Sequence, residues 1–500
     1  MPLAYGLRSV ALSWALMVVG IFTGTQANAH VGNPNVVFEG RAGSFPIRVV
    51  IRQPEVVPGL AEIHVRVLEG HPTRVTALPI HGNTDRSGAP KPDVAQAVSG
   101  DPALFRAELW FMSRGAYGVE VTIEGDQGGS VMVPVNSVAY SRAPMPTVLL
   151  SVVGLLCLVL SIGLVSILAA GFREASLIAG DSLSSVHQKR GWIGATIGLA
   201  AVIGGIYGGN LWRRSEDDNH RTRVLFRPFE HQIGQVSSNS ISRLHLSLTD
   251  RRATDRNYAL MSDHGKLIHL FLIGITSPPA FAHLHPVREK GTVYESVLPP
   301  LPPGEYRVFA DLTHEVGVTQ ILTNQLKIVE PPRKTELSDP DDSWLAEATT
   351  GSELCQLGEG MTMTLKVAPS QTKAEGVSFQ TSVRDAQGSS VAIEPYLRML
   401  GHAVVVRADG GKFAHIHPSG TLSMAAARRF SVKVGGTGAA AASDAVCGDL
   451  SALTEGAAFA LGKAGNVSFP FVFPTPGDYW LWVQVKVKGV VRTGFFKVVG

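Results

Sequence analysis

The chain has 500 residues, which is too long for one ordinary domain, and its 53 glycines and 30 prolines with only 17% charged residues favour β-rich modules over helical bundles. The formal net charge of +3 is small for this length and no basic run stands out, so the sequence gives no electrostatic reason to expect a nucleic-acid partner.

Residues 1–29 are typical of a signal peptide. Arg8 is the only positive charge before an apolar stretch, and Ala27, Asn28 and Ala29 form the small-x-small pattern of a signal peptidase site. Cleavage there would leave His30 as the first residue of an exported chain. The alternative is an uncleaved first helix with the same final orientation, which would remove the free amine at His30.

Residues 30–142 read as strands throughout. Six segments with strand composition are separated by Gly, Pro and Asp turns, from "FPIRVVIRQ" to "SVMVPVNSVAY". We therefore expect an all-β sandwich of immunoglobulin size. The Gly-Ala-Tyr-Gly-Val stretch near its end, followed by Val-Pro-Val, resembles the small exported FixH-like and YtkA-like sandwich families, which belong among copper-handling proteins.

His30 is a weak metal candidate. A terminal amine and an imidazole on one residue can chelate copper, and mature CopC-type proteins of copper resistance look similar at their start. Such a site needs a further histidine, for which His64, His71 and His81 are available. No spacing ties these residues together, so we favour the simpler interpretation that His30 only marks the end of the signal.

Two uncharged segments predict a transmembrane hairpin. Residues 147–171 are long enough to cross about 30 Å of hydrocarbon, and residues 191–212 are flanked by Trp192 and Trp212 as interface anchors. The second segment contains glycines four residues apart, which let a neighbouring helix approach closely: Gly194 and Gly198, Gly204 and Gly208, Gly205 and Gly209.

The topology follows from this order of segments. An exported residue 30 places residues 30–146 and 213–500 on one side of a bacterial inner membrane, the periplasmic side, and residues 172–190 in the cytoplasm. The positive-inside rule adds only weak support, because Arg213 and Arg214 follow the second span. We expect a linker at 213–240.

The remaining chain contains one strand-rich unit twice. The segment "LIHLFLIGITSPPAFAHLHP" (267–286) aligns with "LGHAVVVRADGGKFAHIHP" (400–418), and "LPPGEYRVFADL" (301–312) aligns with "PTPGDYWLWVQV" (474–485). We assign repeat 1 to 241–331, a Pro- and acid-rich linker to 332–344, and repeat 2 to 345–500. The expected fold is mainly β, with three immunoglobulin-like β-sandwich modules and a two-helix transmembrane hairpin.

Each repeat carries a pair of histidines separated by one residue. In repeat 2, a two-residue turn centred on Asp409 and Gly410 would place His402 opposite His417, with His415 two residues along the same face. Three imidazoles would then converge, and a slip of one residue would separate them.

Repeat 1 has the same arrangement around a longer turn, so that His269 faces His285 with His283 beside them. It also adds His264, Asp311 and His314, where repeat 2 has no counterpart of His264 and has Gln484 and Val487 at the other two positions. Repeat 1 is therefore the better candidate if only one repeat binds tightly.

Neutral imidazoles on one patch suit copper, zinc or nickel. The alternative is structural: half-buried histidines that bond to neighbours across the sheet would be copied intact by a duplication. The candidate metal residues are His264, His269, His283, His285, Asp311, His314, His402, His415 and His417.

The repeated HxHP and Pro-Gly-(Glu/Asp)-Tyr motifs resemble tandem exported YtkA-like and CopC-like domains of bacterial heavy-metal proteins. The resemblance covers roughly residues 240–500 and implies copper as the favoured metal, used for resistance, delivery or sensing. The membrane and the metal ion are the expected partners, and a copper transporter or an oxidase-assembly protein is a candidate protein partner.

Two further expectations concern cysteines and catalysis. Cys355 and Cys447 could form a disulfide in an oxidising compartment. No nucleophile elbow, phosphate loop or His-Glu-x-x-His helix is present, so we expect no enzyme. The alternatives are a metal-free membrane-tethered scaffold and a copper-dependent redox enzyme, for which His30 is the only supporting residue.

Overall fold

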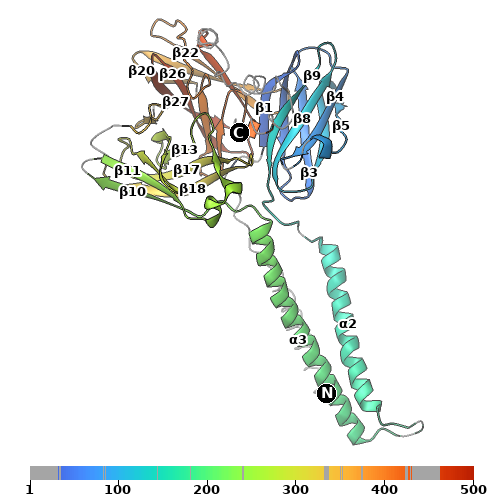
Figure 1. Ribbon diagram of the computed structural model, residues 1–500. Helices are drawn as coiled ribbons and strands as arrows, with labels where there is room; N and C mark the ends of the chain where they lie inside the picture. The colour runs from blue at the N-terminus through green and yellow to red at the C-terminus, as the bar shows by residue number, and fades with distance from the viewer. Residues whose placement is uncertain are drawn as a thin grey trace.

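A computed structural model shows a mainly β protein that stands on a pair of long helices (Figure 1). The structure describes residue 32 and residues 35–500, except for 83, 85, 144, 179, 181, 239–240, 331–336, 349–350, 352, 373–374, 423–425, 428–429 and 431–461. The expected signal peptide and His30 lie outside the described residues.

The N-terminal body consists of two antiparallel sheets around one core. Each of the six predicted segments lies in a strand. The five-stranded sheet has the order β1 (Asn35–Ala42), β2 (Phe45–Arg52), β3 (Gly59–Val67), β7 (Asp101–Phe111) and β6 (Gln96–Val98). The four-stranded sheet has the order β5 (Asp93–Val94), β4 (Arg74–His81), β8 (Gly115–Glu124) and β9 (Gly129–Ser137), and a 3-10 helix, η1 (Arg86–Gly88), precedes β5.

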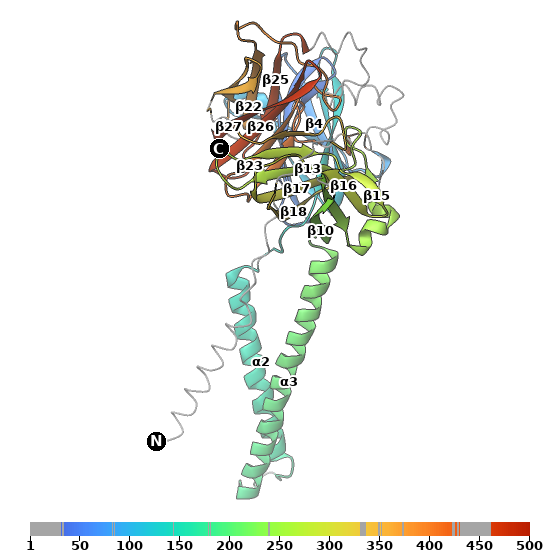
Figure 2. The same ribbon diagram turned by 90° about the vertical axis from the view of Figure 1, so that its left-hand side faces the viewer.

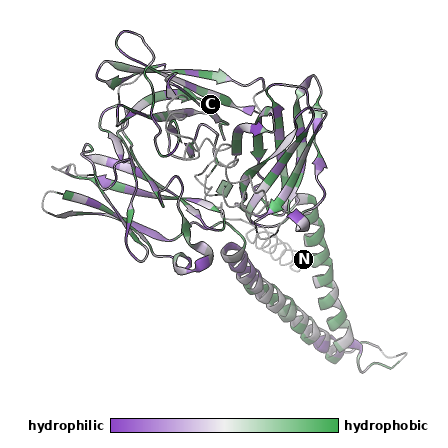
Figure 3. Cartoon of the chain, turned by 45° about the horizontal axis from the view of Figure 1, so that its top comes forward, coloured by the Kyte–Doolittle hydropathy of each residue, from purple (hydrophilic) through white to green (hydrophobic). Residues whose placement is uncertain are grey.

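Two helices follow, α2 (Thr147–Glu174) and α3 (Ser185–Arg223), and both are long and apolar enough to cross a membrane. Figure 3 shows α2 hydrophobic along its length, whereas the end of α3 near the sheets is hydrophilic. The second helix is longer than the predicted 191–212, because the charged residues 213–223 continue it instead of starting a linker. At 39 residues and about 1.5 Å per residue, α3 exceeds a hydrocarbon thickness of about 30 Å.

The helices form a hairpin. The start of α2 and the end of α3 both lie next to the three β-sheet units, which we call the β bodies. Figures 1 and 2 both show α2 and α3 side by side, with every sheet at one end of the pair. Phe226 N donates to the Ala139 carbonyl over 2.8 Å, and Arg142 pairs with Asp217 at 2.7 Å. The segments before and after the hairpin therefore lie on the same side of it, as the predicted topology requires.

Repeat 1 folds into two sheets around its own core. One sheet has the order β10 (His231–Ser238), β11 (Ile241–Leu248), β16 (Val293–Val297) and β15 (Val287–Lys290). The other has the order β12 (Leu260–Met261), β17 (Gly304–His314), β13 (His269–Gly274), β14 (Phe281–Leu284) and β19 (Ser343–Leu345), and β18 (Thr319–Ile328) also pairs with β17. Two 3-10 helices, η2 (Arg251–Thr254) and η3 (Arg256–Tyr258), precede β12.

Repeat 2 has the same plan. Its first sheet has the order β20 (Leu354–Gly358), β21 (Met361–Pro369), β22 (Val377–Arg384) and β25 (Asn466–Phe471). Its second sheet has the order β24 (Phe413–Ile416), β23 (His402–Arg407), β26 (Asp478–Val487) and β27 (Val490–Val499).

The histidine-bearing sheets of the two repeats pack face to face. In β23, Ala403 and Val405 enter the core of repeat 2, whereas Val404 and Val406 enter a second apolar layer that also contains Phe271 of repeat 1. Alternation along a strand explains this division, since successive side chains leave opposite faces of the sheet. Aromatic rings join the repeats in this layer, with Phe309 stacked on Phe413 and Phe281 stacked on Trp482.

The N-terminal body docks on repeat 2. Thr421 N donates to the Val37 carbonyl over 2.9 Å, and the guanidinium of Arg66 binds the Glu375 carboxylate. Gly420 adopts φ +126°, and a Cβ there would lie 1.9 Å from Val37 O, so the contact requires glycine. This docking brings the N-terminal body against the loop that follows His417.

Candidate metal centre

The ladders agree with the predicted register of both hairpins. Ala403 pairs with Ile416, which places His402 across from His417 one step further along. Leu270 pairs with Leu284, which places His269 across from His285 in the same way. The turn itself differs by one residue from the prediction: Gly410 N donates to the Arg407 carbonyl over 2.7 Å, so Ala408 and Asp409, and not Asp409 and Gly410, occupy its centre. The pairing of the two strands is nevertheless the predicted one.

The imidazoles of each hairpin converge as expected. In repeat 2 the ring centroid of His417 lies 5.0 Å from that of His402 and 4.6 Å from that of His415. In repeat 1 the His283 ring lies 4.5 Å from His285 and 5.3 Å from His269.

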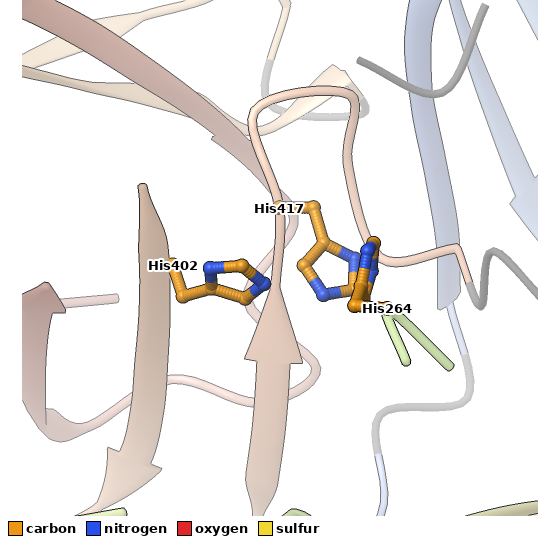
Figure 4. Close-up of side chains that lie close together, drawn as sticks. All are labelled: His264, His402 and His417. Atoms are coloured by element: carbon orange, nitrogen blue, oxygen red, sulfur yellow. The ribbon is translucent and has the colours of Figure 1, made fainter. Parts of the chain in front are cut away.

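The two hairpins form one cluster, whereas the sequence suggested two separate sites. Two groups of three rings each have nitrogen atoms within 4.8 Å of one another, and each group draws on both repeats. We call them the 269 trio (His269, His283, His415) and the 402 trio (His264, His402, His417). Figure 4 shows the 402 trio, with His264 reaching the histidines of repeat 2 from a separate segment. Which repeat binds a metal ion more tightly stays a prediction.

His264 reaches repeat 2 because it stands at the tip of a tight turn. Asp263 and Lys266 exchange two backbone hydrogen bonds, and His264 and Gly265 between them adopt φ of 52° and 86°. Repeat 2 has the same turn between Tyr396 and Met399, where Leu397 occupies the position of His264. A turn with two positive φ angles is uncommon for residues other than glycine, and histidine is one of the side chains that tolerate it best.

Four imidazoles share one pattern of contacts. Each has an oxygen atom near Nδ1: Asp342 Oδ1 at 3.0 Å from His285, Leu422 O at 3.0 Å from His417, Gln484 Oε1 at 2.8 Å from His283, and Asp311 Oδ2 at 3.4 Å from His415. Such contacts favour the tautomer with hydrogen on Nδ1 and leave the Nε2 lone pair available. Outer partners of this kind accompany most histidine metal ligands.

Several of the remaining ring nitrogens are buried without a partner. Among the described residues, Nε2 of His285, His415 and His417 and both nitrogens of His402 make no hydrogen bond. Unsatisfied buried polar atoms are costly, and several of them in one cluster call for an explanation. His269 Nδ1 and His283 Nε2 lie 3.0 Å apart, and His269 Nε2 lies 3.2 Å from the Asp263 carbonyl.

Burial keeps the cluster neutral. His283 and His402 are fully buried, and His415 has the largest exposure of the seven rings, only 8%. Burial lowers the pKa of His415 to about 3, and burial together with neighbouring imidazoles lowers the pKa of His269, His283 and His402 well below 6.5. Neutral imidazole is the form that binds metal ions.

The predicted linker belongs to this centre. Asp342 accepts a hydrogen bond from the backbone N–H of His285 over 2.7 Å as well as contacting its ring, and burial raises the pKa of the Asp342 carboxyl to about 7. Ser343 pairs with His283 in the ladder, so β19 extends the sheet of repeat 1. Lys266 of repeat 1 donates to the carboxylate of Asp339 over 2.6 Å, which attaches the linker to repeat 1 at a second point. A run of acidic residues between repeats was the available signal, but composition alone indicated a spacer.

Asp311 and His314 have different outcomes. Asp311 touches His415, and burial raises the pKa of its carboxyl to about 7. His314 lies apart from the cluster: its Nδ1 is 2.7 Å from the Tyr258 carbonyl, and its Nε2 is 2.6 Å from Gln320 Nε2. Neither His314 nor Asp311 belongs to a metal-type grouping of the described residues.

The other candidates stay untested. His64, His71 and His81 belong to no metal-type grouping within the described residues. Cys447 lies outside the described residues, and Cys355 is buried in the core of repeat 2, so their disulfide remains a prediction. Two further groupings were not anticipated. His285 lies with Asp339 and Asp342 of the linker, and His245 lies with Glu289 and Glu295 on the more exposed sheet of repeat 1.

Comparison with known proteins gives little information on function. A family described as Domain of unknown function (DUF8832) matches residues 356–499, which lie in repeat 2. No curated protein matches the chain. Dimeric latent PorU from Porphyromonas gingivalis has 8% identity and a TM-score of 0.15, with 93% of this chain and 34% of that chain covered. A putative membrane anchored protein from Corynebacterium diphtheriae has 9% identity and a TM-score of 0.14, with 94% and 96% covered.

Proposed function

We propose that this protein is a membrane-anchored metal-binding protein whose ligands are the histidines shared between the two repeats. The observation that carries the proposal is the set of buried ring nitrogens that make no hydrogen bond among the described residues, at His285, His402, His415 and His417. A cation held by the 269 trio would use the free nitrogen of His415, and another held by the 402 trio would use those of His402 and His417. His285 belongs to neither trio and groups instead with Asp339 and Asp342.

The arrangement favours metal binding over a purely structural role. Histidines retained for hydrogen bonding across the sheet would use both ring nitrogens, yet both nitrogens of His402 are unused within the described part of the chain. The oxygen contacts at Nδ1 of His283 and His417 also match the outer partners that orient histidine ligands. A metal ion would offset the cost of burying these polar atoms.

Copper is the metal we propose, with zinc and nickel as the other candidates. Imidazole nitrogen suits all three, and both trios consist only of imidazoles. Calcium and magnesium prefer six or more oxygen ligands, which neither trio provides.

We further propose that the three β bodies are immunoglobulin-like sandwiches on the periplasmic side of a bacterial inner membrane. Their position at one end of the helix pair supports a common compartment (Figure 1). In that setting the protein would store, deliver or sense copper, with a transporter or an oxidase-assembly protein as its partner.

Metal analysis of the full-length protein in nanodiscs tests this function. After loading with copper and removal of excess ion, the parent retains stoichiometric metal, and the double variant His283→Ala, His285→Ala loses at least half of it. His71→Ala, an exposed histidine outside the cluster, is the matched control and retains the parental content. A parent that retains no copper, zinc or nickel overturns the proposal and leaves the membrane-tethered scaffold. Turnover of a redox substrate by the loaded parent would instead favour the copper enzyme.

A further inference from the structure

A cavity of about 110 Å³ lies where the N-terminal body meets both repeats. Its lining includes Gln53 and Asn136 from the N-terminal body, Asp263 and Asp311 from repeat 1, and His415 and His417 from repeat 2. A water molecule needs at least about 10–15 Å³ by this measure, so the cavity has room for a small ion and several waters. Of the seven clustered histidines, His415 and His417 are the members that line it, one from each trio.

The lining contains several unused hydrogen-bond acceptors. Gln53 Oε1 and Asn136 Oδ1 are buried and make no hydrogen bond among the described residues, and the same holds for Nε2 of His415 and His417. Asn136 donates from Nδ2 to the Thr319 carbonyl over 2.8 Å, which fixes Oδ1 as its unused atom. Two carboxyl groups add to this set, and the described lining contains no lysine or arginine.

Unused acceptors suit a hydrated cation. The water molecules around a divalent ion donate hydrogen bonds outward, so amide and carboxylate oxygens can hold the ion with its water shell before imidazole nitrogens replace that shell. The fully buried rings of His283 and His402 lie deeper. An ion that enters through this cavity would meet His415 and His417 first.

We infer that this cavity is an entry site for hydrated divalent metal ions, built between the N-terminal body and the repeats, through which both trios are loaded. The inference rests on the proposed function and adds a role for the N-terminal body, which contributes oxygen atoms at the mouth of the centre. It makes the rate of metal loading sensitive to residues that belong to neither trio.

A charge series at Gln53 tests the entry site. The full-length metal-free protein in nanodiscs is mixed with Cu²⁺ at low ionic strength, and the growth of the Cu²⁺ absorption band gives the loading rate. We expect Gln53→Glu to load faster than the parent, Gln53→Leu slower and Gln53→Lys slowest, with about tenfold between the charged variants. Metal content at equilibrium stays at the parental value, because Gln53 lies outside both trios. Gln96→Lys, an exposed residue of the same body outside the cavity lining, is the matched control and loads at the parental rate.

The outcomes separate this inference from the proposed function. A parent that binds no metal overturns the function itself. A parent that binds metal while all three Gln53 variants load at one rate overturns only the entry site. Asn136→Leu provides an independent check, because it removes the unused oxygen without adding charge. Slower loading of this variant to an unchanged final content supports the entry site, and a lower final content at an unchanged rate counts against it.

Discussion

The carboxylate of Asp311 in repeat 1 lies 3.4 Å from Nδ1 of His415 in repeat 2. Gln484, the residue aligned with Asp311, contacts Nδ1 of His283 in repeat 1 at 2.8 Å. Each of these residues stands opposite the first histidine of its own hairpin, His269 or His402, and reaches across to the other repeat. The two repeats thus exchange equivalent contacts, and each trio of histidines draws on both of them.

Substitution of Asp311 tests whether this exchange tunes the ligands. We expect Asp311→Asn to weaken copper affinity about 10- to 100-fold, because the amide cannot stabilise positive charge on the His415 ring as a carboxylate does. A competition titration against a chelator of known affinity measures the change. Asp409→Asn, in the exposed turn of the repeat 2 hairpin, is the matched control. An unchanged affinity in Asp311→Asn would mean that the contact is only structural.

The two trios predict two metal ions per chain. We expect His402→Ala and His269→Ala each to lower the copper content from two equivalents towards one, since each removes a ligand from a different trio. Elemental analysis of the full-length variants gives the stoichiometry. Loss of both equivalents in either variant would show that the seven rings act as one site. A parent with a single equivalent contradicts the two-ion arrangement.

The metal-free protein should lose stability in mild acid. Burial lowers the pKa of six clustered histidines in the folded state: His269, His283, His285, His402, His415 and His417. Below about pH 6.5 the unfolded chain therefore binds more protons than the folded chain, and protonation stabilises the unfolded state. The carboxyls of Asp311 and Asp342, whose pKa values are raised to about 7, act in the opposite direction. Each group contributes at most about 1.4 kcal/mol per pH unit, so six histidines outweigh two carboxyls.

Thermal unfolding of the metal-free protein at pH 7.5 and 5.5 measures this effect. The apparent Tm is expected to be several degrees lower at pH 5.5. His402→Gln removes one titrating ring and should reduce the difference. A Tm that is equal or higher at pH 5.5 would show that the rings accept protons in the folded state, which the burial argues against.

The linker between the repeats should contribute to stability. Asp342→Ala removes the acceptor for the His285 backbone N–H and ring, and leaving such a donor unsatisfied costs about 1–3 kcal/mol. Chemical unfolding of the full-length protein would show a lower midpoint. Glu347→Ala, at an exposed position just after the linker, should leave the midpoint unchanged. Equal midpoints in both variants would mean that the linker is only a spacer.

The sequence was sufficient to predict the register within each hairpin, but not which other part of the chain packs against it. The Asp-Gly signal at 409–410 and the two-residue alternation were sufficient to place His402 across from His417, although the turn is centred one residue earlier. Alternation shows which side chains share a face of a sheet, but it does not show what covers that face. Pairing of the two hairpins therefore became visible only in three dimensions, as did the reach of His264 into repeat 2.

The linker illustrates the same limit. Asp342 lies in a stretch whose proline and acidic content is typical of a spacer, and nothing local distinguishes a solvated aspartate from one that accepts hydrogen bonds from His285. His314 was grouped with the candidate ligands because it follows Asp311 by three residues. Its position at the end of β17 instead directs it towards Tyr258 and Gln320.

The glycines of α3 allow one prediction with an internal control. All three predicted pairs were expected to let α2 approach closely. A Cβ at Gly194 would lie 2.4 Å from Leu168 O, and one at Gly198 would lie 2.9 Å from Val165 Cα, whereas Gly204 and Gly208 have nothing within 4 Å in the described structure. Only the pair far from the β bodies therefore lies at the helix contact.

The same substitution should consequently have opposite effects at two places on one helix. We expect Gly194→Ala to lower the unfolding midpoint of the protein in nanodiscs, because the methyl group forces the backbones apart. Gly204→Ala meets no neighbour and gains up to about 1 kcal/mol of helix propensity, so its midpoint should stay the same or rise. The loss of helix content during unfolding gives the midpoint of each variant, and these two midpoints are compared. Equal destabilisation by both would mean that another surface covers Gly204, such as a second copy of the hairpin within the membrane.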